Sequence, residues 1–153
     1  MSNESGNALG SRVICQVGLI VRDIERSSAA YADLFGVEVP QWSLTDAYES
    51  AHTEYHGQPT AARAKLAFFD MDSVQLELIE PVGGPSTWQA FLDTHGEGVH
   101  HLALQIKGMA EQIELLDRKG MPLEQQGDYT GGRYAYIDSV PQLKVMLELL
   151  END

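Results

Sequence analysis

Two neighbouring histidines, His100 and His101, lie in GEGVHHLALQI at residues 96–106, a largely apolar stretch that predicts a β-strand. Neighbouring side chains on a strand point to opposite faces, so only one of the two imidazoles can face a pocket. His101 would share its face with small and polar residues, whereas His100 would lie among leucines and an isoleucine. The pattern favours His101 as a candidate metal ligand and assigns His100 to a core face.

Three more polar residues stand alone on apolar strand faces. Gln16 lies in VICQVGLIV, Glu77 in SVQLELIE and Glu148 in LKVMLELL. A carboxylate in such a place must be paired, protonated or bound to a metal ion. Each residue by itself is most simply a hydrogen-bonded buried group. Partners at matching positions would make a shared site the better interpretation.

The elements that must position these residues occur twice in the same order. Strand 13–21 and helix 24–35 precede strands 65–69 and 74–80, and strand 99–107 and helix 109–119 precede strands 122–126, 133–138 and 143–150. Residues 37–62 hold a short strand and a loop insertion, so both halves read βαβββ. Gln16 and His101 match in the first strands, and Glu77 and Glu148 match in the last. We expect an α+β fold of two tandem βαβββ modules.

The module boundaries follow from the breaks in this pattern. We expect a flexible N-terminus at residues 1–11, a first module at 12–82 and a second at 98–151. The linker at 83–97 contains a short helix over TWQAFLDTH, for which Ser86 and Gln89 form a capping box.

Composition limits the partners and the compartment. The chain has 153 residues and a net charge of −13, which argues against nucleic acid and anionic membranes. It has no apolar run long enough to span a bilayer, and its polar start does not resemble a secretion signal. Cys15 is the single cysteine, so a reducing cytoplasm is expected.

Five segments carry a resemblance to a known family: CQVGLIVRDIERSSAAYADLFG, LELIEP, GEGVHHLAL, GGRYAYID and VMLELLE. From about residue 13 to 151 the chain resembles the vicinal oxygen chelate superfamily of glyoxalases, methylmalonyl-CoA epimerases and bleomycin-resistance proteins. LELIEP and GEGVHHLAL are most similar to the epimerases. The resemblance implies that the paired modules form a cupped, barrel-like mixed β-sheet. We also expect a homodimer.

The resemblance places four metal ligands on Gln16, Glu77, His101 and Glu148. This set is similar to that of eukaryotic glyoxalases, whereas epimerases usually have a histidine at the place of Gln16. Such donors suit one divalent ion, Zn²⁺, Ni²⁺, Co²⁺ or Mn²⁺, and leave room for a substrate oxygen. The implied reaction is proton transfer next to a carbonyl through a metal-stabilised enolate, by an isomerase, epimerase or lyase. Glu148 is the candidate base, because the matching glutamate of the family alternates between ligand and base.

The expected substrate is a small-molecule carbonyl compound or thioester. Arg133 in TGGR, together with His52 and His56 in AHTEYHG, are the candidate substrate-binding residues, although a surface role is an equal or better interpretation. Glutathione-dependent relatives hold the tripeptide with arginines, and the positions here that resemble theirs are Ile20 and Glu97. Glutathione is therefore disfavoured, and coenzyme A would also need cations for its phosphates. A smaller carbonyl or hydroxy compound fits better.

Two other functions remain open. Ring-opening dioxygenases of this superfamily use two histidines and one carboxylate for iron, and the four positions here hold one histidine. A metal-free binding protein of the antibiotic-resistance type lacks the ligand set. The four donors favour the metal-dependent enzyme over both alternatives.

Overall fold

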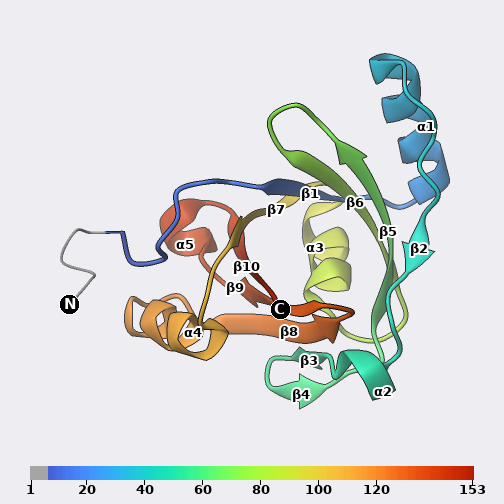
Figure 1. The fold of residues 1–153 in the computed structure, drawn as a ribbon. Coiled ribbons are helices and arrows are strands. Elements are labelled where there is room, and N and C mark those ends of the chain that lie inside the picture. The colour runs from blue at the N-terminus through green and yellow to red at the C-terminus, as the bar shows by residue number, and fades with distance from the viewer. Residues whose placement is uncertain (1–6) are drawn as a thin grey trace.

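The computed structural model describes residues 7–153, whose strands form one mixed, strongly curled sheet (Figure 1). Its strands are β1 (Gln16–Ile20), β2 (Ser43–Leu44), β3 (Glu54–Tyr55), β4 (Gln58–Pro59), β5 (Arg63–Asp70), β6 (Gln75–Val82), β7 (Gly98–Gln105), β8 (Leu123–Tyr129), β9 (Gly132–Ile137) and β10 (Met146–Asn152). The helices are α1 (Ile24–Phe35), α2 (Tyr48–Ala51), α3 (Thr87–His95), α4 (Met109–Arg118) and α5 (Val140–Leu143). The strand order across the sheet is β2-β5-β6-β1-β7-β10-β9-β8-β3-β4. Residues 1–6 of the predicted N-terminal segment lie outside the described part.

Two similar halves meet at the centre of the sheet. In each half the first strand pairs in parallel with the last, β1 with β6 and β7 with β10. The first strands of the two halves, β1 and β7, pair antiparallel with each other. The α+β fold of paired βαβββ modules in a cupped sheet, predicted from the repeat and the resemblance, is confirmed.

The helices divide between the two sides of the curl. α1 packs on the outer face of β5 and β6 through a cluster that contains Ile24, Phe69 and Leu78, and α4 packs similarly on β9 and β10 through Leu116 and Leu149. α3 lies inside the curl, where Trp88 joins a third cluster (Figure 1). Within the described residues, every helix is too short or too polar to cross a membrane.

The last strand of each half carries two glutamates three residues apart. Glu77 in β6 and Glu148 in β10 are buried, and alternation turns Glu80 and Glu151 to the opposite face. There, Glu80 accepts a hydrogen bond from the N–H of Ile24 at 2.9 Å. Glu151 accepts from the N–H groups of Gly108 and Met109 at 2.8 and 3.1 Å. The same short motif therefore faces the inside with one carboxylate and holds the start of a helix with the other.

The insertion in the first half pairs with strands at both edges of the sheet. β2 pairs with β5 at one edge, whereas the hairpin of β3 and β4 pairs with β8 at the other. The chain between them, including α2, crosses the open side of the curl (Figure 1). The segment predicted as an irregular loop thus forms a wall of the molecule.

The last strand begins later than predicted. Its expected start at Leu143 is wrong, because residues Val140–Leu143 form the helical turn α5 and β10 starts at Met146. Pro141 fits the first turn of a helix, and Lys144 ends it with a left-handed backbone at φ 68°.

Candidate metal centre and substrate cavity

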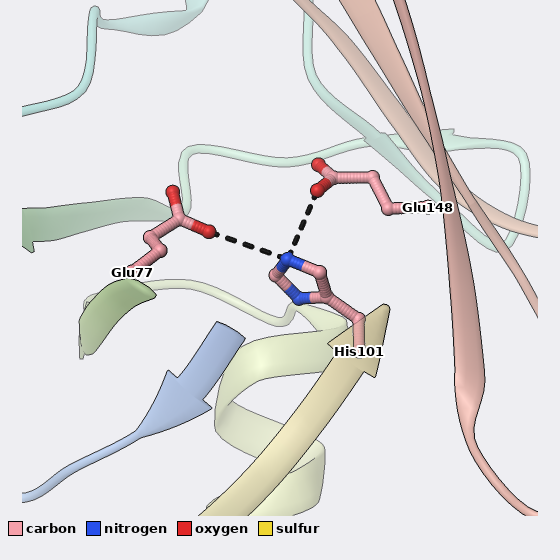
Figure 2. Close-up of side chains that lie close together, drawn as sticks. All are labelled: Glu77, His101 and Glu148. Atoms are coloured by element: carbon pink, nitrogen blue, oxygen red, sulfur yellow. Dashed lines mark ion pairs between the residues drawn. The ribbon is translucent and has the colours of Figure 1, made fainter. Parts of the chain in front are cut away.

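Three ionisable side chains from three strands converge at one point inside the curl (Figure 2). Nε2 of His101 on β7 lies 3.3 Å from Oε1 of Glu77 on β6 and 3.0 Å from Oε1 of Glu148 on β10. Their exposed fractions are 0% for His101, 7% for Glu77 and 4% for Glu148. Groups of this polarity are buried in proteins only when paired or bound to a metal.

Gln16 on β1 brings an amide to the same point. Its Oε1 lies 2.9 Å from Nε2 of His101, and its Nε2 donates to Oε1 of Gln75 at 2.7 Å. Turning the amide round would let it donate to both carboxylates, at 3.2 and 3.1 Å. However, Gln75 donates its own Nε2 to Asp70 at 3.4 Å, which leaves its oxygen facing Gln16. This chain of amides favours the orientation with the Gln16 oxygen inward.

The four donors fit a divalent cation. Ligand atoms at about 2.1 Å from such an ion lie about 3 Å apart when adjacent, as the distances around His101 Nε2 do. The ligand atoms of Glu77, His101 and Glu148 all lie within 4.8 Å of one another. An inward amide oxygen among carboxylate oxygens has no hydrogen to share with them, so a cation would complete the set.

Electrostatics couple these groups tightly. Burial disfavours the imidazolium of His101, but the charges and hydrogen bonds of Glu148 and Glu77 outweigh it and raise the pKa of His101 to about 10. Burial raises the pKa of Glu77, while the hydrogen bond from His101 lowers it. Without a bound cation, a protonated His101 thus lies between the buried side chains of Glu77 and Glu148.

His100 does not lie on the core face that strict alternation predicted. The β1–β7 register shifts between Gly18 and Leu19, which oppose His101 and Val99, so His100 is an extra, bulged residue. The bulge turns its ring towards His101, with 3.0 Å between the two Nδ1 atoms, and towards Tyr136, with 5.1 Å between the ring centroids. Both histidines are therefore buried on the same side of the sheet.

A chain of buried hydrogen bonds runs from His100 to α3 and on to β8. Its Nε2 lies 3.1 Å from Oγ1 of Thr87, and the Thr87 N–H donates to Oε1 of Gln125 at 2.8 Å. Gln125 in turn donates to the hydroxyl of Tyr134 at 3.1 Å. Burial, and then the charge of His101, hold the pKa of His100 well below its usual range. His100 is thus a neutral link between His101 and the helix inside the curl.

Gly18 provides the space for the His101 ring. A Cβ at this position would overlap Cε1, Nδ1 and Nε2 of the imidazole. In the antiparallel pairing, Gly18 opposes His101 and Ala103 opposes Gln16, so the ligand on the first strand of each half faces a small residue of the other half.

Gln16, Glu77 and Glu148 line a cavity of about 510 Å³, and His101 lies beside them. Its walls combine neutral polar and acidic side chains with aromatic and aliphatic ones, and Phe68, Trp88, Tyr129, Tyr134 and Tyr136 are the aromatic members. The segment Ser43–Asp46 from the insertion lines the opposite wall. This size and lining are typical of small-molecule sites.

Of the candidate substrate-binding residues, none lines this cavity. Arg133 alternates with Tyr134 and Tyr136, so it lies on the outer face, where it pairs with Glu151 at 3.2 Å and with Asp153. His52 pairs with Asp128 at 3.0 Å and His56 with Glu124 at 3.2 Å, and both histidine side chains are 60% exposed. These two pairs connect the insertion to β8.

Sequence reasoning missed the aromatic wall, although a signal for it exists. In GGRYAYID, alternation places Tyr134 and Tyr136 on one face and Arg133 on the other. Gln75 and Thr87, which support the ligands, have no comparable signal because each lies next to its partner only in the folded chain.

Known proteins resemble this chain in sequence or in fold. A sequence profile described as the Glyoxalase/Bleomycin resistance protein/Dioxygenase superfamily matches residues 15–136. An uncharacterized protein, YqjC, of Bacillus subtilis is 34% identical over 93 residues, which cover 58% of this chain and 66% of that protein, just under two thirds of its length.

Solved structures are more distant in sequence. A hypothetical protein from Bacillus halodurans has a TM-score of 0.62 at 19% identity, covering 92% of this chain and 94% of its own. Methylmalonyl-CoA epimerase from Mycobacterium tuberculosis has a TM-score of 0.61 at 20% identity, covering 92% and 88%. A single-site variant of the Streptomyces coelicolor epimerase, in complex with 2-nitronate-propionyl-CoA, has a TM-score of 0.62 at 20% identity, covering 92% and 96%. At these identities the likeness concerns the fold.

Proposed function

The chain belongs to the glyoxalase/bleomycin resistance protein/dioxygenase superfamily, and on that premise we propose that it is a metal-dependent enzyme. Its reaction is proton transfer at the carbon next to a substrate carbonyl, as in an isomerase, epimerase or lyase. One observation carries the proposal: four donor side chains from four strands meet beside a cavity of small-molecule size, and three of them line it. The epimerases among the solved structures support the reaction class, through the fold alone.

Gln16, Glu77, His101 and Glu148 would hold one divalent ion, Zn²⁺, Ni²⁺, Co²⁺ or Mn²⁺. When bound, the ion would supply positive charge against the negative charge that develops on the substrate carbonyl oxygen. Gln75 fixes the amide of Gln16, and the packing around His101 keeps its Nε2 directed at the same point.

Glu148 is the proposed base. Its carboxylate lines the cavity and lies next to His101, so it reaches both the ligand set and the space for a substrate. Glu77 lines the cavity as well, but it lies across the imidazole from Glu148. A proton taken by Glu148 can return to the same substrate, which is sufficient for a one-base isomerisation.

The test is exchange of the substrate's carbon-bound proton with solvent deuterium. Metal-loaded protein is incubated in D₂O with a panel of 2-hydroxy ketones, 2-hydroxy amides, 2-oxo acids and acyl thioesters, and exchange is followed by proton NMR. We expect exchange for at least one class and a loss of about 10²–10⁴-fold in Glu148→Gln, the usual contribution of a catalytic base.

The matched control is Glu114→Gln, which makes the same chemical change at a 75% exposed side chain on α4. Elemental analysis accompanies the assay, with one divalent ion per chain expected for wild-type protein. Exchange that survives in Glu148→Gln would remove Glu148 as the base. Failure to take up any of the four ions would contradict the metal-dependent reaction.

A binding protein of the antibiotic-resistance type is the second candidate. The aromatic walls of the cavity favour it, because such walls bind flat apolar molecules without chemistry. Tight binding of such molecules by metal-free protein, with no exchange after metal loading, would select this function. The homodimer and the cytoplasmic location expected from the sequence stay predictions.

A further inference from the structure

The charges around the cavity point to a particular class of substrate. We propose that the site takes an uncharged, largely apolar carbonyl compound with a flat body, and that it rejects carboxylates and phosphate esters. This inference deepens the proposed function and rests on it.

The charged side chains in the cavity wall are all acidic. Asp46 and Asp128 lie in the wall with Glu77 and Glu148, and among the described residues no lysine, arginine or histidine lines it. A divalent ion at the base would be balanced by Glu77 and Glu148, so it would leave no net positive charge for an anionic substrate. Asp46 would then repel a second negative group on the substrate, and Asp128, which pairs with His52 at 3.0 Å, would not attract one.

The basic residues of the neighbouring strands face away from the cavity. On β5, Leu66 and Phe68 line the cavity, so alternation turns Arg63 and Lys65 to the other face. Lys65 pairs there with Glu80 at 3.4 Å, and Arg63 donates to the backbone oxygen of Thr45 at 2.8 Å.

On β9 the same alternation turns Arg133 outward, beside Tyr134 and Tyr136 of the cavity wall. Its partners, Glu151 and Asp153, already neutralise it. A carboxylate held in the cavity away from the metal centre would therefore lose water without gaining a cation, which is costly.

The aromatic and aliphatic part of the wall suits an apolar body. The aromatic members lie with Leu44, Leu66 and Leu150 around about 510 Å³. Trp88 and Tyr136 are only 4% and 2% exposed, and the indole N–H of Trp88 donates to the Tyr136 hydroxyl at 3.1 Å. Because this hydrogen bond occupies the indole donor, the rings present mainly apolar surface to a ligand.

The test uses an isosteric pair that differs in charge alone. Mandelamide and mandelate have the same ring and hydroxyl, but one ends in an amide and the other in a carboxylate. Isothermal titration calorimetry of metal-free protein, in which no ion can bind the carboxylate, should show mandelamide binding at least about tenfold more tightly, since the carboxylate would be buried unpaired. Coenzyme A alone, as a phosphate ester, should show no binding.

A pair of charge-reversal variants locates the effect. Asp46→Lys places a cation in the cavity wall. It should narrow or reverse the preference for mandelamide over mandelate, mainly by strengthening mandelate binding. Glu49→Lys is the matched control, because it makes the same change of net charge on an exposed residue of α2 outside the cavity wall. It should leave the preference as in wild type.

Mandelate binding as tightly as mandelamide to wild-type protein would overturn the inference, as would equal effects of the two lysine variants. The binding assay needs no turnover, so it is independent of the exchange assay. A preference for mandelamide without any deuterium exchange would support this inference and contradict the proposed reaction. Deuterium exchange observed only with carboxylate substrates would support the proposed reaction and overturn this inference.

Discussion

At the scale of single residues, the two ring nitrogens of His101 have different neighbours. Nε2 faces Glu77, Glu148 and the amide of Gln16, and Nδ1 faces Nδ1 of His100 at 3.0 Å. If Nε2 binds a cation, the ring proton must lie on Nδ1, and His100 must accept it. The remaining N–H of His100 then donates to Thr87. His100 is a positioning residue in this arrangement.

Replacing His100 with leucine removes that acceptor and keeps the site apolar. We expect zinc affinity to fall by about 10–100-fold, the usual effect of losing the hydrogen-bond partner of a metal-binding histidine. Competition with a chromogenic chelator measures it, and His95→Leu on α3 is the control. Circular dichroism checks the fold. Unchanged affinity in a folded His100→Leu protein would remove the positioning role.

The sequence was sufficient to place Gln16, Glu77, His101 and Glu148 on faces that could meet, because alternation along regular strands is simple. It failed for His100, since the extra residue of a β-bulge breaks the alternation and depends on register with another strand. It also could not tell that Arg133 already has acidic partners, because Glu151 lies opposite it only once β9 and β10 pair, and Asp153 follows at the end of the chain.

At the scale of elements, one strand performs two tasks in each half. Its inner glutamate faces the cavity, and its outer glutamate, Glu80 or Glu151, binds the N–H groups where a helix begins. The N-terminus of a helix carries partial positive charge, so a carboxylate stabilises it. A shift of β10 along its own direction would therefore move both the ligand Glu148 and the start of α4.

Glu151 gives a prediction with a defined pH dependence. The N–H groups of Gly108 and Met109 lower its pKa, so its stabilisation is fully present above the unfolded value of about 4.3 and is lost as pH falls through the lower folded value. Glu151→Gln should lower the thermal unfolding midpoint at pH 7. Between pH 5 and 3 the midpoint of the variant should decrease less than that of the wild-type protein. Calorimetry measures both.

The comparison variant is Glu114→Gln, since Glu114 is an exposed glutamate within α4. It should follow the wild-type profile. A Glu151→Gln protein with an unchanged midpoint at neutral pH would show that the helix start is held by other contacts.

Helices were predictable because their caps are local. Asp23 accepts from the N–H of Arg26, and Ser86 from that of Gln89, and both signals are visible in the chain. The hairpin of β3 and β4 was not predictable, because its short strands gain their stability from pairing with β8, about 70 residues away. The turn α5 was missed because the leucine and valine after Pro141 resemble a strand.

At the scale of the whole molecule, each half supplies two of the four donors. Gln16 and Glu77 come from the first half, and His101 and Glu148 from the second. An ion bound to all four would connect the halves at the place where β1 and β7 already pair. Binding energy of this kind adds to the stability of the fold.

Thermal unfolding should therefore respond to metal. Zinc at a hundredfold excess over its dissociation constant should stabilise the wild-type protein by about 2.7 kcal/mol. Glu77→Gln should lose most of that gain, because it removes one anionic ligand of the set. Differential scanning calorimetry with and without zinc measures the gain. An equal gain in the variant would show that the ion binds elsewhere.

Within residues 7–153, the insertion that crosses the open side of the curl occurs in one half only. Two equivalent modules alone would offer an entering molecule two approaches related by an approximate rotation. With Ser43–Asp46 on one wall and no counterpart from the other half in the described chain, the two approaches differ. An added loop thus makes the two sides of a duplicated scaffold distinguishable to any molecule that enters it.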